Sequence, residues 1–330
     1  MKISVIIAAY HGEAFIADQL KSLFYQTLVP DEILIGDDSC DTKTLDEINR
    51  VRNQFSGELR IIRNPVRLGI IRNFRNLALE ATGDVIFFCD QDDYWLPEKI
   101  ETMVKALEEH PGKMVVVCNS EVTNEKLASR QELLLDRTPA FYQFASRLER
   151  GDWESFRDIF MQKFNFSGHN MAMRKEIRDL FAEMPGDYLY HDIWLAQIAS
   201  LGGKLLYVDK VLTLYRQHEN NASGQLVKHR NKIRELLSLF SHSTDEIEKT
   251  WSRLKNMIRI TEREKYLSLF PSQNLEGLKA FTDYYGKRVE LHKKNFGFRM
   301  WTAAQLLLDY FRFGLGVRSL IRDLLIKEKV

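Results

Sequence analysis

Short apolar segments alternate with helical segments over roughly the first 120 residues, and this alternation constrains the fold more than any other feature. The predicted strands are Ile3–Ala9, Glu32–Gly36, Leu59–Ile62, Val85–Cys89 and Met114–Cys118. The predicted helices between them are Glu13–Gln26, Ile70–Ala81 and Glu98–Glu109. Repeated strand–helix units of this length form a mostly parallel sheet with right-handed crossovers and covering helices. We therefore expect an α/β fold.

The strand and helix patterns change after this region. Residues 121–160 are more polar and irregular, with a helix predicted at Trp153–Phe160. Two strand-like segments, Phe166–Met173 and Lys204–Tyr215, flank a predicted helix at Asp192–Ser200. Beyond Gly224 only the helical spacing of Leu and Phe remains. We therefore predict a sheet domain over residues 1–224, with halves 1–120 and 121–224, and a helical region over residues 225–330.

The composition is that of an ordinary globular protein and excludes several classes. The 330 residues are 45% hydrophobic and 28% charged, and the net charge of +1 gives no reason to expect nucleic acid as a partner. The three cysteines are dispersed without zinc-ligand spacing, which fits a reducing compartment. No run of eighteen apolar residues is free of charge, and the N-terminal segment lacks the features of a signal peptide. We expect a protein of the cytoplasm or of a membrane surface.

An acidic cluster, Asp90-Gln91-Asp92-Asp93, directly follows the predicted strand Val85–Cys89. Ligands bind outside the carboxyl ends of strands in open α/β sheets, so the cluster should lie at a binding edge. Crowded carboxylates repel one another, and hard oxygen ligands favour Mg²⁺ or Mn²⁺. The cluster therefore predicts a metal site. The alternative is a helix cap by Asp92 or Asp93, for which one acid would be enough.

A second acidic turn, Gly36-Asp37-Asp38-Ser39, ends another predicted strand and should open onto the same edge. A carboxylate there can accept hydrogen bonds from a nucleobase or a ribose, although the same residues also suit an Asx turn. The turn after the first strand contains neither Gly-x-Gly-x-x-Gly nor a Walker A motif. Since no glycine-rich loop holds phosphates, a metal ion bridging the phosphates is favoured.

The last forty residues form a basic amphipathic stretch. Residues 291–330 contain eight Lys or Arg and three acidic residues, a net charge of +5, with apolar side chains between them and Gly314 and Gly316 dividing the stretch. Such a segment can lie in the headgroup region of an anionic bilayer. It can equally be a helix pair that packs on its own domain with a solvated polar face. Both interpretations remain open at this point.

Seven motifs, in order, resemble those of family 2 glycosyltransferases, which have the GT-A (Rossmann-like) fold. They are Ser4–Tyr10, Asp37–Asp41, Leu68–Phe74, Asp90–Trp95, Ser167–Ala172, His191–Trp194 and Tyr215–Asn221. The combination is especially similar to bacterial rhamnosyltransferase-like members that build polysaccharides. The resemblance covers about residues 1–224, and no diagnostic motif follows. It implies a nucleotide-binding half over residues 1–120 and an acceptor half over residues 121–224.

The resemblance also implies roles for individual residues. Asp92 would bind the metal with His218, and Asp192 would be the general base, preceded here by His191 instead of the commoner Glu. The donor-binding residues would be Ala9, Tyr10, Asp37, Asp38, Asn73, Asp90 and Arg216. The acceptor-side candidates are His169, His191 and Trp194.

The resemblance implies an inverting, metal-dependent transfer from a nucleoside-diphosphate sugar, dTDP-rhamnose being favoured over UDP sugars. The acceptor would be a polysaccharide or a lipid-linked sugar at the inner face of the cell membrane. Two alternatives remain. A sugar nucleotidyltransferase would need a glycine-rich, basic loop after the first strand, which residues 9–14 do not provide. A catalytically silent relative would bind nucleotide sugars without transferring them.

Overall fold

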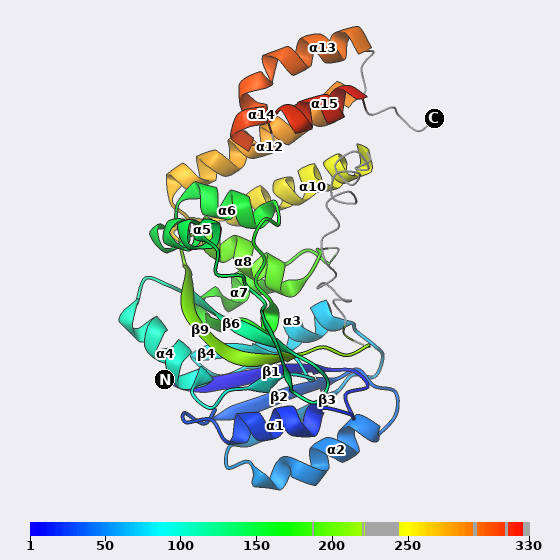
Figure 1. The fold of residues 1–330 in the computed structure, drawn as a ribbon, viewed down its shortest axis with the longest axis vertical. Coiled ribbons are helices and arrows are strands. Elements are labelled where there is room, and N and C mark those ends of the chain that lie inside the picture. The colour runs from blue at the N-terminus through cyan, green and yellow to red at the C-terminus, as the bar shows by residue number, and fades with distance from the viewer. Residues whose placement is uncertain (187, 220, 222–243, 293–295, 314–315, 326–330) are drawn as a thin grey trace. The chain divides into compact units, whose positions relative to one another are not determined.

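The computed structural model describes residues 1–186, 188–219, 221, 244–292, 296–313 and 316–325 (Figure 1). The chain divides into two compact units, Met1–Gly224 and Gln225–Val330. Asn220 of the last motif, and Lys293, Lys294, Lys327 and Lys329 of the basic stretch, lie outside the described residues.

A nine-stranded sheet forms the centre of the first unit, in the order β3-β2-β1-β4-β8-β6-β9-β5, with β7 paired to β6. The strands are β1 (Ile3–Ala9), β2 (Glu32–Asp37), β3 (Glu58–Arg63), β4 (Val85–Cys89), β5 (Tyr94–Trp95), β6 (Val115–Thr123), β7 (Ser129–Leu133), β8 (Met171–Arg174) and β9 (Leu205–Arg216). Strands β1 to β4 pair in parallel, as do β6 and β9. The prediction of a mostly parallel α/β sheet flanked by helices is confirmed.

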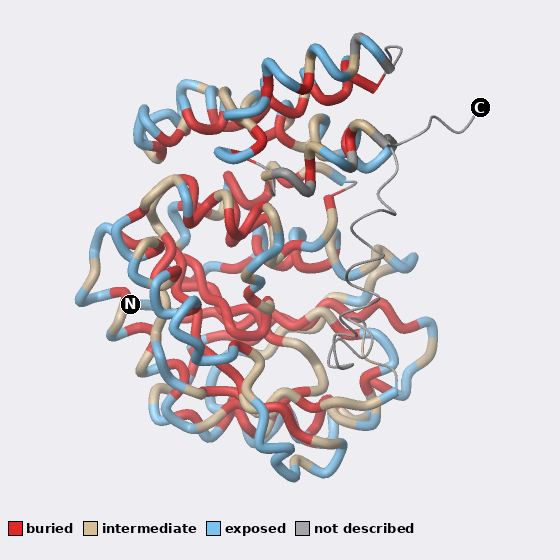
Figure 2. Tube along the Cα trace, turned by 45° about the horizontal axis from the view of Figure 1, so that its top comes forward, coloured by how far each residue is buried: buried red, intermediate tan, exposed pale blue. Residues whose placement is uncertain are grey.

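Burial explains why the predicted strands form. Every residue of β2 and β4 is buried, as expected for strands covered on both faces by helices (Figure 2). The helices of this unit are α1 (Ile16–Phe24), α2 (Lys43–Val51), α3 (Ile70–Glu80), α4 (Lys99–Glu109), α5 (Pro139–Arg150), α6 (Trp153–Phe160), α7 (Arg178–Ala182) and α8 (His191–Leu201). Helix α1 buries Ile16, Leu20, Leu23 and Phe24, the residues whose spacing predicted it.

The register brings three strand ends to one edge of the sheet. Ala9, the last residue of β1, lies opposite Asp37 of β2, and Ile7 lies opposite Cys89 of β4. The turns that follow β1, β2 and β4 therefore meet at this edge, as predicted from the sequence.

One part of the sheet differs from a simple series of βα units. Strand β8 lies between β4 and β6 and runs antiparallel to both. It begins 48 positions after the end of β6 in the chain, so local patterns carry no sign of this neighbour. Residues 121–160 are also more ordered than expected, because they contain β7 and α5. Thr138 caps α5 through its side chain, and Pro139 occupies the first turn, and both residues are helix-start signals in the sequence.

The described part of the second unit is helical, as predicted. Its helices are α10 (Thr244–Thr261), α11 (Glu264–Leu267), α12 (Ser272–His292), α13 (Phe296–Gln305), α14 (Leu307–Phe313) and α15 (Val317–Leu325). Asp323 of α15 is fully buried and bonds the Arg288 guanidinium through both oxygens, at 2.6 and 2.8 Å. The Tyr310 hydroxyl donates to the same carboxylate at 2.7 Å, so one acid joins α12, α14 and α15. No helix in the described ranges is long and apolar enough to cross a membrane.

Candidate active site

The two carboxylates of the turn after β2 are held by hydrogen bonds from neighbouring protein groups. Asp38 is 4% exposed, and its oxygens accept from Asn64 Nδ2 at 2.7 Å and from the Gly69 amide at 2.8 Å. Asp37 is fully buried and accepts from the Ser39 amide at 2.9 Å, which is the Asx-turn arrangement. Asp38 also donates its backbone N–H to the Ala9 carbonyl at 2.9 Å. The predicted nucleobase contacts therefore lie together at the end of β1.

Gln91 connects the turn after β1 to the acidic loop. Its side-chain amide accepts from the Tyr10 N–H at 2.9 Å and donates to the Tyr10 carbonyl at 3.0 Å. The Tyr10 ring is 38% exposed and carries the Arg67 guanidinium 3.9 Å above its centroid. Tyr10 thus offers an aromatic surface at the mouth of the site, fixed relative to the acids by Gln91.

Asn73 supports the site from within. It is buried, and its amide donates to the Gly36 carbonyl at 2.7 Å. A Cβ on Gly36 would lie 2.0 Å from Asn73 Oδ1, so this close approach requires a glycine at the end of β2. Asn73 therefore supports the end of β2, next to the turn that was predicted to bind the donor.

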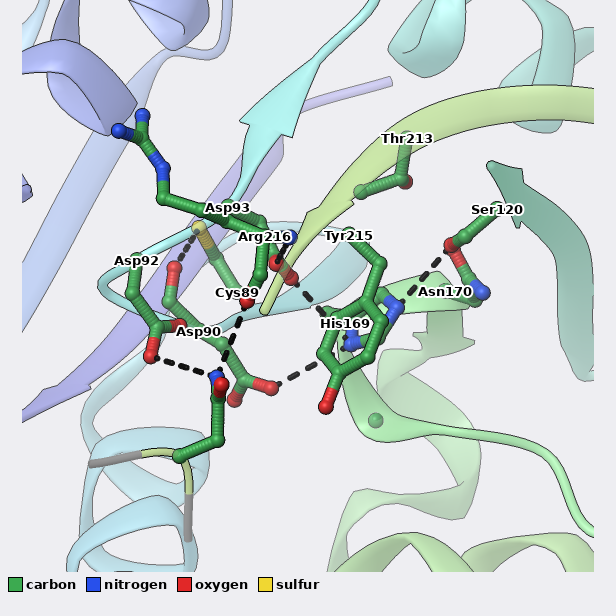
Figure 3. Close-up of polar contacts among 12 residues, drawn as sticks. Cys89, Asp90, Asp92, Asp93, Ser120, His169, Asn170, Thr213, Tyr215 and Arg216 are labelled. Carbon is green, nitrogen blue, oxygen red and sulfur yellow. Dashed lines mark hydrogen bonds and ion pairs between the residues drawn. The ribbon is translucent and has the colours of Figure 1, made fainter. Parts of the chain in front are cut away.

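His169 lies between the acids that follow β4 (Figure 3). Its Nδ1 is 3.3 Å from Asp90 Oδ2 and 3.3 Å from Asp93 Oδ2, and its Nε2 is 3.0 Å from Ser120 Oγ. The ring is 2% exposed and stacks on Tyr215 with 5.2 Å between centroids. His169 was predicted on the acceptor side, but in this structure it is bound to the acidic loop itself.

The charges of this group depend on one another. Burial disfavours protonation of His169, but the neighbouring Asp93 and Asp90 outweigh burial and raise the pKa of the imidazole. Burial would raise the pKa of Asp90, but its hydrogen bond to His169 and the nearby charges of His169, His191 and Lys99 together outweigh burial and lower it. Burial, together with the charges of Asp92 and Asp90, raises the pKa of Asp93 to about 7. A protonated His169 therefore offsets part of the negative charge of the loop.

A buried lysine that sequence reasoning missed holds this group in place. Lys99 is 0% exposed, and its ammonium donates to the His169 carbonyl at 2.5 Å and to Thr213 Oγ1 at 2.7 Å. It lies 3.7 Å from the centroid of the Trp95 ring, and burial lowers its pKa. A signal did exist: Lys99 precedes the buried Met103 and Leu107 at four-residue spacing, on the apolar face of α4.

Asp92 faces His218, as a shared metal site would require. Asp92 Oδ2 lies 2.8 Å from His218 Nε2, although the residues are 126 positions apart in the chain. Both side chains are mostly buried, 14% and 7% exposed, and the His218 ring packs against Phe15. A carboxylate oxygen and an imidazole nitrogen suit a divalent cation, so these two residues fit the predicted ligand set.

A second set of possible ligands lies on the same loop. One ligand atom each from Asp90, Asp93 and His169 lie within 4.8 Å of one another. The sequence did not single out Asp93 as a ligand. Asp93 and His169 are almost fully buried and already paired, whereas Asp90 keeps 35% of its side chain exposed. Asp90 is therefore the member of this set that can also reach a ligand from outside.

Arg216 joins the acidic loop through its backbone. Its N–H donates to Asp93 Oδ1 at 3.0 Å. Its guanidinium donates to the Glu125 carbonyl at 2.8 Å and lies 3.6 Å from Asp18 Oδ2. Arg216 is 4% exposed, so a direct contact with a diphosphate requires this side chain to leave those partners.

Asp192 lies in the first turn of α8, where sequence reasoning placed the base. Its Oδ2 accepts from the Gly168 N–H at 3.0 Å and its Oδ1 from the Ile193 N–H at 2.7 Å. Gly168 is the residue before His169, which contacts Asp90 and Asp93. The Asp192 carboxylate is therefore one residue away from this group. The residue remains half-buried, with part of its surface open to a ligand.

His191 and Trp194, the other two predicted site residues of this segment, are more deeply buried than Asp192. The His191 ring stacks on Phe74 at 4.2 Å, neither ring nitrogen has a hydrogen-bond partner, and burial lowers its pKa. Trp194 is 0% exposed and donates its indole N–H to the Phe181 carbonyl at 3.1 Å. Trp194 is therefore a core side chain in this structure, and it offers no face to an acceptor sugar.

Comparison with known proteins identifies the family of the chain. The family model described as glycosyl transferase family 2 matches residues 4–181, more than half of the chain. The chain belongs to this family. It is a glycosyltransferase, and the predicted resemblance is confirmed.

Individual relatives agree with the family. The dTDP-rhamnosyl transferase RfbG of Shigella flexneri is 27% identical over 241 residues, which cover 70% of this chain and 78% of that protein. The structure of S. aureus TarS 1-349 in complex with UDP-GlcNAc matches with a TM-score of 0.56 at 16% identity, covering 98% of this chain and 89% of that one. The mannosyltransferase PcManGT from Pyrobaculum calidifontis, in complex with GDP-Man and Mn²⁺, matches with a TM-score of 0.52 at 16% identity, covering 97% and 78%. These two structures support the GT-A fold of the glycosyltransferase.

Proposed function

We propose that this glycosyltransferase is inverting and uses a divalent cation to move a sugar from a nucleoside diphosphate to a polysaccharide or lipid-linked acceptor. The observation that carries the proposal is the placement of two groups at one edge of the sheet. The Asp92–His218 pair and Asp90 form one group and Asp192 forms the other, and the two are connected because Gly168 donates to Asp192 and the next residue, His169, contacts Asp90.

The donor would bind over the ends of β1, β2 and β4. Tyr10 offers its exposed ring to the nucleobase beside Ala9 and Asp38, and Asp90 offers its exposed oxygen to ribose or sugar. Asp92 and His218 would hold Mg²⁺ or Mn²⁺, which offsets the charge of the departing diphosphate. The likeness to RfbG favours dTDP-rhamnose, while TarS and PcManGT were solved with UDP-GlcNAc and GDP-Man.

Asp192 would act as the general base for the acceptor. The acceptor hydroxyl passes its proton to the carboxylate, and its oxygen forms the new bond to the anomeric carbon. The bond from that carbon to the diphosphate oxygen breaks on the opposite face, and the electron pair leaves with the diphosphate. A single displacement inverts the anomeric centre, so one carboxylate is enough and no covalent intermediate forms. The Gly168 and Ile193 amides hold Asp192 in a fixed orientation for this step.

Nucleotide sugars are made in the cytoplasm, so we place the enzyme there, at the inner face of the membrane when the acceptor is lipid-linked. A nucleotidyltransferase is disfavoured, since the turn after β1 is held by Gln91 and lacks a glycine-rich basic loop.

The test is donor hydrolysis and transfer across a panel of nucleotide sugars, with Mg²⁺, Mn²⁺ or a chelator. We expect one preferred donor, loss of activity with the chelator, and a product of inverted anomeric configuration by NMR. Asp92→Ala should lose the metal-dependent part of nucleoside-diphosphate binding in calorimetry. Asp46→Ala, which removes an exposed acid from α2, is the matched control. Full binding by Asp92→Ala would remove this residue from the metal site, and absence of binding by the wild-type protein would identify a silent relative.

A further inference from the structure

The second unit carries large apolar side chains on a solvent-facing surface. Met300 and Trp301 of α13 are 49% and 57% exposed, and Leu307, Leu308 and Phe311 of α14 are 43%, 82% and 60% exposed. We call these five residues the apolar face. Met300 and Leu307 are seven positions apart, as are Trp301 and Leu308, and Phe311 follows Leu307 by four. Seven positions are about two helical turns, so these side chains form a stripe along the two helices.

The opposite side of the same helices forms the core of the unit. Ala303, Leu306, Tyr310 and Phe313 are 3% exposed or less. Burial changes from residue to residue along α13 and α14 (Figure 2). These helices are therefore apolar on two sides, and only one of these sides is buried by packing within the unit. An exposed apolar stripe of this size, including a Trp, is typical of a contact surface and is rare on a surface that faces only water.

The charges of this region indicate which type of partner the apolar face would bind. Residues 291–330 carry a net charge of +5. The two acids on the described helices α13–α15 are directed to basic partners: Asp323 is buried against Arg288, and Asp309 lies 4.0 Å from Lys287. Arg312, next to Phe311, is exposed, and its guanidinium lies 4.9 Å from the Phe313 ring. Outward apolar residues within a segment of excess positive charge complement an anionic lipid headgroup layer.

We propose that the apolar face of α13 and α14 binds the surface of an anionic bilayer, with Trp301, Leu308 and Phe311 inserted among the headgroups. Helices that lie in this way bury one side in the interface and do not cross the membrane. Contact with the bilayer would bring the enzyme to a lipid-linked acceptor. The proposal concerns the second unit and is tested without donor or acceptor, so it stands or fails separately from the proposed reaction.

The test uses the full chain with vesicles of phosphatidylcholine alone or with phosphatidylglycerol, in a sedimentation assay at low and high salt. We expect binding to the anionic vesicles that weakens with salt. Leu308→Asp combined with Phe311→Asp should weaken it by at least about tenfold, since two apolar contacts are replaced by charges that the lipid repels. Leu267→Asp is the matched control, because Leu267 is an equally apolar residue of the same unit, 44% exposed on α11. The helical circular dichroism of both variants should match that of the wild type.

Insertion is checked separately by brominated lipids, which should quench wild-type tryptophan fluorescence and quench the Trp301→Phe variant less. Three results would overturn the proposal: no wild-type binding to anionic vesicles, equal binding by the double variant, or equal binding to neutral vesicles. Light scattering gives a fourth: a wild-type dimer that the double variant converts to a monomer would assign the face to a second copy of the chain.

Discussion

Gly168 is the residue at which the geometry of the proposed base can be perturbed without touching the base. A Cβ at this position would lie 2.6 Å from His191 Nε2, 3.2 Å from His191 Cε1 and 3.5 Å from Asp192 Cβ. Ordinary contacts begin at 3.4 Å, so the His191 ring must move by roughly 0.8 Å. Phe74 and Phe88 pack against this ring, at 4.2 and 5.6 Å between centroids, and restrict its movement. Gly168 must therefore shift as well, and its N–H is the donor to Asp192.

Gly168→Ala should reduce both stability and transfer. Overpacking of this kind costs about 1–3 kcal/mol of unfolding free energy. A displacement of the base approaching 1 Å should lower the transfer rate by roughly 10²-fold. Donor affinity should stay near the wild-type value, because Asp92, His218 and Tyr10 are untouched. Urea unfolding, donor calorimetry and initial rates measure the three quantities.

Two variants make the reasoning refutable. Gly112→Ala is the control, because a Cβ there meets nothing within 4 Å. Removing the obstructing ring in Gly168→Ala/His191→Ala should restore part of the transfer rate lost by Gly168→Ala, with a coupling energy above about 1 kcal/mol. Wild-type transfer by Gly168→Ala, or additive losses in the double variant, would show that the packing around Gly168 does not position Asp192.

Three further predictions use other parts of the structure. Asp192→Asn should keep donor binding and lower transfer by roughly 10²–10⁴-fold, and normal turnover would exclude Asp192 as the base. Lys99→Met should lower the unfolding free energy by about 1–3 kcal/mol, because the His169 carbonyl and the Thr213 hydroxyl lose their buried donor; Lys105→Met, on the exposed side of α4, should have no such effect in urea unfolding. Burial opposes ionisation of Asp323, but Arg288, together with hydrogen bonds from His292 and Tyr310, outweighs it and holds the pKa below the ordinary 3.8. The unfolded chain therefore binds more protons, and the stabilisation from this acid, full at neutral pH, is lost as the pH falls below about 4. Arg288→Met should remove that pH dependence from urea unfolding of the full chain.

The parts of the fold that depend on local pattern were predictable. Continuous apolar runs identified β1, β2 and β4, and the spacing of Ile16, Leu20 and Leu23 identified α1. The position of β8 between β4 and β6 was not predictable, since a short strand such as Met171–Arg174 carries no signal for which neighbour it pairs with. Strand pairing over such a separation is decided by packing of the whole sheet.

In the candidate site, too, local features were predictable from the sequence and contacts between distant segments were not. The acids after β2 and β4 could be placed at one edge because parallel strands carry their ends to the same side. The partner of each acid could not, since contacts such as Asp92 with His218 and His169 with Asp93 form only when distant loops meet. The motif also does not reveal which of its side chains are buried. Trp194 and His191 belong to a recognisable segment, yet their side chains are covered by α7, α3 and β4.

The antiparallel strand β8 also affects how the protein can be made. Synthesis runs from the N-terminus, so β4 emerges with β1 as a neighbour but without β8 until residue 174 has left the ribosome. During that interval the nascent chain presents Val85–Cys89, five consecutive apolar residues, as an unpaired edge that invites aggregation. Residues 1–120 expressed alone would keep this edge permanently and should be insoluble. The segment that closes the edge also brings Gly168 and His169 to the acids, so we expect completion of the sheet and assembly of the proposed catalytic groups to be coupled.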